Sequence, residues 1–522
     1  MPYYNMLHAH GETATPTGNL YVRWTYPKCP IVRLLLSDCT NPEVVRAKLV
    51  ERGLPIHGKE GRDRIISELS DLHSYPDTPL AEAPGWSGPA YVLRDGQIIL
   101  PSGADPVIPA FRVSPRATAN VGSVRDWKRK VAKPLVGQDL PIFAISLALS
   151  IPLFPIVGIA RGIIVELVGP PSTGKTMIQN LTAGVFNAPD GEILAFRELT
   201  PSGGSDLSLA SDTLLLVDDP QALLAGQTSS RIGTAVRDII MQLSEGRYNR
   251  HPGGSTAGTL IAARQSLVEQ VGADTAVGKL IRDRLITLRI SDGSDFGAFN
   301  TIPQQYCSSA GFCDAVAGAA RTYYGSIGKQ FVQRLVQDLA DNETDLISDI
   351  QDSIKSFRER AKIGIVSGYN PRDMEAFGVV YAAAVLARRY KIFPKNWRFG
   401  TNILACLDRH LRGNEPDTPF VDQLVSIANG SDVVFIDADI PSNCATIKRS
   451  EVYVTNRKGR RELLIRPEAL SKLLPAWRGN QPPPGLLDFI VKEKGHFTVQ
   501  RRLRKGMRLR LHAFRLPSEN AD

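Results

Sequence analysis

The sequence predicts an α/β protein organised around a parallel β-sheet, and three observations predict this class. Ile163–Val168 is a short apolar run rich in β-branched residues, which is typical of a parallel strand buried on both faces. A glycine-rich segment and then a helix-compatible stretch follow this run directly. A second apolar run, Thr213–Val217, ends in the carboxylates Asp218 and Asp219, as strands do at the functional edge of such a sheet.

Length and composition are those of an ordinary multidomain globular protein. The 522 residues are 43% hydrophobic and 22% charged, enough for about three domains with normal cores. We divide the chain into an α+β N-terminal region (1–118), the sheet domain (119–298), a helical region (299–393) and a C-terminal basic module (394–522) that resembles a winged helix.

The N-terminal residues lack a basic region followed by an apolar core, so we expect no signal peptide and a cytoplasmic location. The most apolar stretch, Leu140–Ala160, is interrupted by Pro141, Pro152 and Pro155. We therefore predict helices packed beneath the sheet there, and no membrane span. The six cysteines include no C-x-x-C pair, which favours reduced thiols over a zinc site.

In the N-terminal region, local signals predict one helix and one hairpin. Asn41 is placed as an N-cap with Pro42 at the first helical position. The segment 85–98 reads as a β-hairpin with a turn at Asp95-Gly96. Ser123 is the expected N-cap of a helix that leads into the apolar stretch before the sheet.

The glycine-rich segment matches the phosphate-binding pattern G-x-x-x-x-G-K-[ST] in full. In this pattern the backbone N–H groups of the loop and the helix N-terminus surround nucleotide phosphates. Lys175 is expected to reach the β/γ oxygens and the Thr176 hydroxyl to ligate Mg²⁺, so ATP and Mg²⁺ are the predicted cofactors. The alternative is a glycine-rich turn that ends in Lys-Thr by chance, which the strand before it and the helix after it disfavour. The predicted phosphate-binding residues are Gly169, Pro170, Pro171, Ser172, Thr173, Gly174, Lys175 and Thr176.

The apolar run that ends at Asp218 fits the Walker B pattern, in which the strand places a carboxylate beside the magnesium ion. The interval from Lys175 leaves room for a helix and an intervening strand. That spacing suits the division of P-loop proteins that activates water with a carboxylate, so Asp219 is the candidate general base.

Two further groups of residues are candidates on weaker grounds. Arg247, Tyr248 and Arg250 form a basic loop that can contact phosphate and stack a base, and a solvated basic turn is the equal alternative. Arg284 is the candidate arginine finger, directed at the γ-phosphate of its own or of a neighbouring subunit. Its alternative is a surface ion pair with Asp283 or another acid.

The rest of the chain is helical and then basic. Apolar spacing predicts helices at 311–324, 328–339, 343–362 and 374–390. The C-terminal module alternates basic and apolar residues, and its electrostatic footprint favours DNA or RNA. Its alternative is a basic sheet edge kept soluble by charge. The candidate nucleic-acid residues there are Arg501, Arg502, Arg504 and Lys505.

Together these residues resemble DUF927, a bacterial family of domains of unknown function found in phage and mobile elements and often described as helicase- or primase-like. The likeness runs from about Val45 to Tyr390 and implies a helicase-like P-loop ATPase of the RecA/AAA-like kind. Two departures from relatives stand out: Asp219 replaces a usual glutamate, and Ala262-Ala263-Arg264 replaces a polar Ser-Thr-Gly-Glu segment. The matching segments are Arg52–Leu54 with Ile56, Gly85–Trp86 with Tyr91–Leu93, Gly122–Ser123 with Trp127, Ser172–Thr176, Leu214–Asp218, Met241–Gly246, and Tyr324–Gly325 with Phe331 and Leu335.

We therefore expect a Mg²⁺-dependent ATPase that acts on nucleic acid, with DNA as partner, in phage or mobile-element replication. If Arg284 acts on a neighbouring subunit, the active form is a homo-oligomer, such as a ring. The alternative is an ATP-switched regulatory, scaffold or defence protein without strand-separating activity. A small-molecule kinase is less favoured because no acceptor-binding motif follows the phosphate loop.

Overall fold

The computed structural model describes most of the chain, and it divides into two compact units, residues 1–413 and 414–522. Each unit is considered by itself; the predicted boundaries at 118, 298 and 393 stay predictions. The residues described are 6–15, 17–111, 113, 120–159, 161–189, 193–195, 214–218, 229–245, 258–272, 275–290, 296–364, 370–413, 420–430, 433–436, 450–457, 460–474, 477, 486, 489–491, 493, 496–504 and 507–516.

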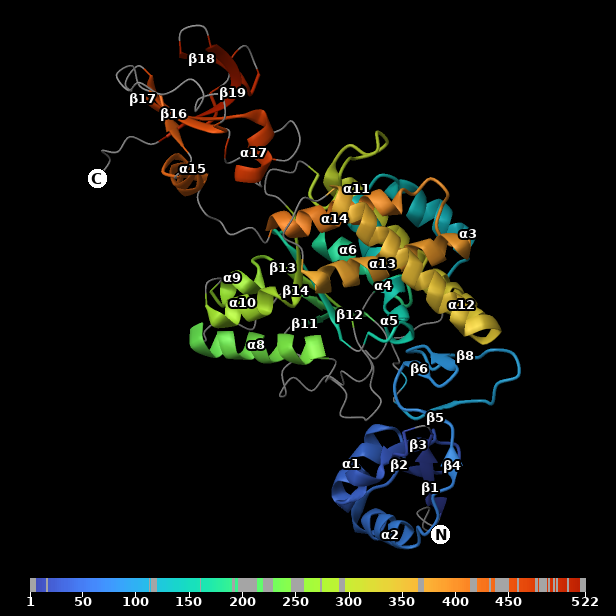
Figure 1. Cartoon of the computed structure of the whole chain (residues 1–522). Coiled ribbons are helices and arrows are strands. Elements are labelled where there is room, and N and C mark those ends of the chain that lie inside the picture. Colours follow the sequence, from blue (N-terminus) through green and yellow to red (C-terminus); the bar gives the residue numbers. More distant parts are fainter. Residues whose placement is uncertain are drawn as a thin grey trace. The chain divides into compact units, whose positions relative to one another are not determined.

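The first unit begins with a small α+β arrangement around its own core (Figure 1). Asn41 caps the first helix as predicted, because its side-chain oxygen accepts the N–H of Glu43. Trp24, Val45 and Ile65 are fully buried between the sheet and the helices. The sheet has the order β3-β2-β1-β4, and its elements are β1 (His8–Ala14), β2 (Leu20–Thr25), β3 (Val32–Leu35), α1 (Pro42–Glu51), α2 (Gly58–Ser70) and β4 (Asp77–Thr78).

The predicted hairpin is confirmed and packs into the main core of the unit. Tyr91 pairs with Ile99 across the hairpin, and both belong to the same hydrophobic cluster as the central helices. Trp86 meets Tyr91 edge to face at 5.1 Å and donates its ring N–H to the carbonyl of Pro152 at 2.9 Å. The short strands are β5 (Leu80–Ala81), β6 (Gly85–Ser87), β7 (Ala90–Val92), β8 (Ile98–Ile99) and β9 (Ile108–Pro109).

A five-stranded parallel sheet forms the centre of the first unit, which confirms the mixed α/β class. Its order is β11-β12-β13-β10-β14, so β13 lies between the first strand and the strand that ends at Asp218. All carboxyl ends of the strands therefore meet along one edge of the sheet. The strands are β10 (Ile163–Val168), β11 (Ile193–Ala195), β12 (Leu214–Asp218), β13 (Gly258–Ala263) and β14 (Leu285–Arg289).

Helices cover both faces of this sheet (Figure 1). Because side chains alternate along a strand, Val165 and Leu167 pack into one hydrophobic cluster and Ile164 into the other. The first face meets α4 (Asp139–Ser150), α5 (Leu153–Ile156) and α6 (Lys175–Ala183), and the second meets α8 (Ser229–Glu245), α9 (Leu267–Gln270) and α10 (Ala276–Arg282).

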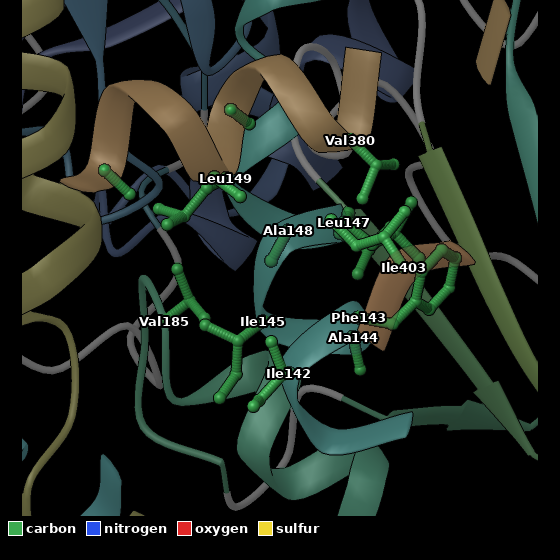
Figure 2. Packing of buried hydrophobic residues seen from close by; sticks show 14 of the residues in the cluster. Ile142, Phe143, Ala144, Ile145, Leu147, Ala148, Leu149, Val185, Val380 and Ile403 are labelled. Atoms are coloured by element: carbon green, nitrogen blue, oxygen red, sulfur yellow. The ribbon is translucent and has the colours of Figure 1, made fainter. Parts of the chain in front are cut away.

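The predicted helices in the apolar stretch before the sheet are confirmed, and α4 is buried on all sides. Every residue from Leu140 to Ser150 is buried, and the buried Ser146 and Ser150 hydroxyls donate to carbonyls of the helix itself. Figure 2 shows its side chains packed against Val185, Val380 and Ile403, which come from other helices and loops. The helix starts after α3 (Val124–Trp127), whose N-cap Ser123 forms a capping box with Asp126.

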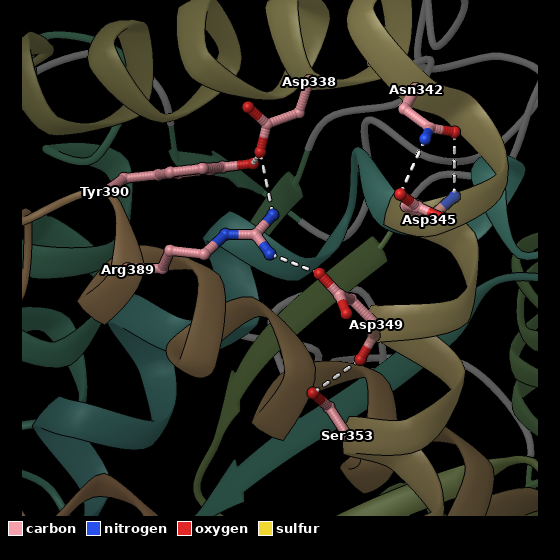
Figure 3. A network of polar contacts seen from close by, with 7 residues as sticks. All are labelled: Asp338, Asn342, Asp345, Asp349, Ser353, Arg389 and Tyr390. Atoms are coloured by element: carbon pink, nitrogen blue, oxygen red, sulfur yellow. Dashed lines mark hydrogen bonds and ion pairs between the residues drawn. The ribbon is translucent and has the colours of Figure 1, made fainter.

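The helical region matches the predicted helices, including the break between two of them. Asn342 has non-helical angles inside α12 and caps the continuing helix by accepting the N–H of Asp345. Arg389, from α13, bridges the two halves of α12 by donating to Asp338 and Asp349 at 2.8 and 2.5 Å (Figure 3). The helices are α11 (Ser309–Thr322), α12 (Ser326–Gly364), α13 (Pro371–Arg389) and α14 (Phe399–Gly413).

The second unit is dominated by one sheet, and this does not confirm the winged-helix prediction. The order β15-β16-β17-β19-β18 contains two basic antiparallel hairpins, β16–β17 and β18–β19. Trp477 and Phe514, which is a residue of β19, are buried in the same hydrophobic cluster. The elements are α15 (Phe420–Ala428), β15 (Val434–Phe435), β16 (Val452–Arg457), β17 (Arg460–Ile465), α17 (Pro467–Leu473), β18 (Val499–Arg504) and β19 (Met507–Arg515).

None of the helices that the structure describes combines the length and the apolar character that a membrane crossing requires.

A buried carboxyl group forms hydrogen bonds in the middle of the central sheet. Glu166, on β10, is fully buried and accepts the hydroxyls of Ser266 at 2.5 Å and Thr287 at 2.7 Å and the N–H of Leu267 at 3.1 Å. Burial raises the pKa of Glu166, and these hydrogen bonds oppose the rise. Thr287 also donates its N–H to Nδ1 of the buried His410, whose Nε2 contacts Asp373 at 3.1 Å.

Glu166→Gln is expected to change how stability depends on pH. Because the pKa is raised on folding, the wild-type chain loses stability as pH rises from the unfolded value of about 4.3 through the raised folded value. The amide does not titrate, so the wild-type Tm minus the variant Tm should fall as pH rises. Thermal unfolding across pH tests this, with the exposed Glu359→Gln as control. A Tm difference that grows with pH would contradict it.

Candidate functional site

The segment Gly169–Thr176 forms a loop from the carboxyl end of β10 to the amino end of α6. The N–H of Gly169 donates to the carbonyl of Ala263 at 3.2 Å, which fixes the start of the loop beside the end of β13. Gly174 is the N-cap of α6 with φ of 91°, a left-handed conformation that favours glycine, and it supplies no side-chain cap. The first N–H groups of α6 are therefore suited to receive an anion.

Lys175 curls back over this loop. Its Nζ donates to the carbonyls of Gly169 and Pro170, both at 2.6 Å. Burial lowers the pKa of the Lys175 ammonium; Asp218 opposes this shift, and Arg264 adds to it. The charges of Asp218 and Arg264 therefore both act on Lys175.

The loop opens onto a cavity of about 600 Å³ at the carboxyl edge of the sheet. The loop contributes Pro171, Ser172, Gly174, Lys175 and Thr176 to its wall. A volume of this size falls in the range of small-molecule sites. Residues of the phosphate loop and Asp218 of the Walker B pattern, which the sequence identified separately, therefore line one cavity.

Asp218 lies where the sequence predicted, at the end of β12, and lines the cavity together with Thr176. The side chain of Gln179 in α6 donates to the carbonyl of Val217 at 2.7 Å, which holds the helix against this strand. A hydroxyl and a carboxylate are hard oxygen donors of the kind that Mg²⁺ uses. Among the described residues no group of three or more His, Cys, Asp or Glu side chains could hold a metal ion by itself.

Arg264 also lines the cavity, directly after the two alanines that end β13. Ala262 is paired with Asp218 in the sheet, so the end of β13 lies beside the end of β12. The segment Ala262-Ala263-Arg264, which the sequence analysis singled out, is therefore part of the cavity wall.

The sequence predicted α11 as a helix but did not indicate that it closes the cavity from outside the sheet. Asp314 and Arg321 both line it. The signal was available in the pattern, because the lining positions of α11 recur at helical spacing and combine small residues with one acid and one base. These positions are Ala310, Cys313, Asp314, Ala317 and Arg321.

Arg284 lies at the opposite edge of the sheet from the loop. It directly precedes β14, whose first residue pairs with Ile164 near the amino end of β10, and its guanidinium donates to the carbonyl of Leu280 at 3.0 Å. This placement gives no support to contact with the phosphates of its own subunit, and the neighbouring-subunit alternative stays a prediction. Arg161 and Arg372 lie in the same small pocket.

Other predicted residues cannot be placed in the same way. Asp219, Arg247, Tyr248, Arg250 and Lys505 lie outside the described residues. Arg502 and Arg504 are in β18, but their side chains are outside the description.

Arg501, in contrast, is placed fully. It forms a two-point ion pair with Glu462, with nitrogen–oxygen distances of 3.1 and 3.4 Å, and both side chains are 11% exposed.

Gly297→Ala is expected to displace the phosphate loop without changing any cavity residue. Gly297 has φ of 61°, and a Cβ there would lie 2.6 Å from the carbonyl oxygen of Thr173, which accepts the N–H of Ala298 at 2.8 Å. We expect binding of a fluorescent ATP analogue to weaken by about 5- to 150-fold, which corresponds to strain of about 1–3 kcal/mol. Gly318→Ala in α11 is the control, since a Cβ there meets nothing within 4 Å. Equal affinities for the two variants would contradict the role of this contact.

Comparison with solved structures supports the fold. A structure described as the active helicase Cch of SCCmec type IV aligns with 98% of this chain and 92% of its own, at 15% identity and a TM-score of 0.53. The apo form of the C-terminal region of NrS-1 aligns with 77% of this chain and 90% of its own at 10% identity. Its TM-score of 0.26 is too low to indicate a shared fold. The chain therefore shares its overall fold with a helicase.

Two comparisons concern the sequence itself. No curated protein matches the chain. The family model described as a domain of unknown function, DUF927, matches residues 31–247, a span that begins before Val45 and ends before Tyr390. Over this span, which contains the phosphate loop and Asp218, the predicted resemblance to the DUF927 family is confirmed.

Proposed function

We propose that this chain is a Mg²⁺-dependent, helicase-like P-loop ATPase that binds and hydrolyses ATP and acts on nucleic acid in phage or mobile-element replication. The observation that carries the proposal is the cavity in which the phosphate loop, Lys175, Thr176 and Asp218 meet at the carboxyl edge of a parallel sheet. The likeness in fold to a structure described as an active helicase supports it.

The residues around the cavity have different proposed roles in binding the phosphates and Mg²⁺ and in positioning water. The N–H groups at the start of α6 and the Lys175 ammonium would hold the phosphates. Thr176 and Asp218 would hold Mg²⁺, which takes its other ligands from phosphate and water and supplies charge stabilisation when bound. Asp219 is proposed as the general base that orients water.

Arg264 and Arg321 extend this assignment beyond the motifs. Both line the cavity, from the end of β13 and from α11. We propose that they stabilise the negative charge that develops on the transferring phosphoryl group, a role in which fixed cations in a partly enclosed site are effective.

A homo-oligomer would explain Arg284. It lies away from its own loop, in a pocket that it shares with Arg161, Arg372, Asp373 and Glu375. Burial, and then Arg161 and Arg284, lower the pKa of Arg372, and the two carboxylates oppose this shift. The three guanidinium groups at the amino edge would suit contact with the phosphates of a neighbouring subunit. DNA remains the proposed partner of the assembly, through its phosphates.

A nucleotide-switched regulatory, scaffold or defence protein is the second candidate. Ala262 and Ala263 favour it, because apolar side chains stand at the end of β13, where the family resemblance implies polar ones. Such a protein would bind ATP and change its affinity for a partner with negligible turnover.

Lys175→Ala should abolish nucleic-acid-stimulated ATP turnover. The ammonium neutralises phosphate charge in a partly buried site, so we expect a loss of about 100-fold or more. Phosphate release with and without single-stranded DNA or RNA measures it, and Lys279→Ala, at an exposed position on α10, is the control. Turnover that ignores nucleic acid, with no binding at low salt, would refute the proposed function; binding without turnover would favour the switch.

Arg321→Ala should lower ATP turnover by about 10- to 100-fold while ATP affinity changes less, because the proposed contact strengthens as charge develops. Steady-state turnover and equilibrium binding separate the two effects. Arg358→Ala removes one exposed arginine from α12 and serves as the control. A loss of affinity equal to the loss of turnover would assign Arg321 to ground-state binding instead.

A further inference from the structure

The second basic hairpin of the C-terminal unit, β18–β19, has two chemically different faces. The register pairs Gln500 with Arg510 and Arg502 with Arg508 on one face. On the other face, Arg501 pairs with Leu509 in the register. Side chains on adjacent residues of a strand point to opposite faces, so these two sets cannot share a ligand.

Arg501 has a structural role. Its guanidinium forms the two-point pair with Glu462 of β17, and both side chains are 11% exposed. A partly buried, bidentate pair of this kind joins two strands and leaves little of the arginine accessible to a partner. Arg501, one of the candidate nucleic-acid residues of the sequence analysis, therefore stabilises the sheet.

Arg508 and Arg510 differ from it in both exposure and pairing. Both are exposed, and among the described residues neither has an acidic side chain within ion-pair distance. The Nε of Arg510 donates to the Thr498 hydroxyl at 2.8 Å, which orients the guanidinium beside β18. These two side chains present positive charge that the described part of the unit does not neutralise.

The spacing of the two described arginines on this face suits a polyanion. Arg508 and Arg510 are two residues apart on β19, so their positions lie about 6.8 Å apart along the strand. Successive phosphates in an extended nucleic-acid strand have a spacing of the same order, so both guanidinium groups can contact one backbone.

We propose that the face that carries Gln500, Arg508 and Arg510 is a binding site for the phosphate backbone of single-stranded nucleic acid. The proposal deepens the proposed function and rests on it, since it names the surface through which the ATPase holds its nucleic acid. Recognition is by charge and is independent of base sequence.

The test is a double variant of the full chain, Arg508→Gln with Arg510→Gln. The matched control, Lys472→Gln with Arg515→Gln, removes the same charge from an exposed position on α17 and from an exposed strand position on the opposite face. Binding of fluorescent oligo(dT) and oligo(rU) is followed by anisotropy from 50 to 300 mM salt, with thermal unfolding to verify that all variants fold.

We expect the double variant to bind at least about tenfold more weakly at low salt. The slope of log K against log[salt] should become shallower by about 1.4, which is about 0.7 for each lost phosphate contact on single strands. The control should keep the wild-type slope, and ATP turnover without nucleic acid should be unchanged in both.

Equal losses for variant and control, or no loss in either, would overturn the proposal, as would a loss confined to DNA or to RNA. If wild-type binding depends on this face but nucleic acid does not stimulate ATP turnover, the proposed function fails and the binding site stands.

Discussion

The fold depends on α4, a helix that is apolar on every side. A helix of this kind is stable in water only when other elements cover its whole circumference. In the first unit α6, α13 and α14 pack against it. Figure 2 shows Val380 of α13 and Ile403 of α14 among its side chains. Because α6 starts at the phosphate loop, the packing of α4 also fixes the position of that loop.

A second constraint is the buried polar path through the sheet. Glu166 joins β10 to Ser266 and Thr287, and Thr287 continues through His410 to Asp373 at the start of α13. Each buried group in this path has a partner, and a shifted register would leave several without one. The path therefore selects one alignment of the strands, which apolar packing alone specifies less sharply.

The candidate site combines elements that are distant in sequence. The loop after β10, the end of β12, the end of β13 and α11 contribute one cavity, although more than 100 residues separate Lys175 from Asp314. The parallel sheet brings the first three together because its strands end at one edge, and α11 joins them by packing against α6. The cationic groups of the cavity therefore come partly from outside the two motifs.

Local pattern determined the parts of this protein that depend on neighbouring residues. The strand Ile163–Val168, the caps Asn41 and Ser123, the break before Asn342 and the phosphate loop could all be predicted, because each follows from periodicity, capping or loop chemistry within a few residues. Tertiary structure decided what depends on contacts between distant residues. Arg501 forms an ion pair with Glu462, and Arg284 lies at the edge of the sheet opposite its own phosphate loop. The helix α11 lines the cavity, and the described strands of the C-terminal unit form one five-stranded sheet. An exposed arginine and a paired one look alike in sequence, and only the register of the strands distinguishes them.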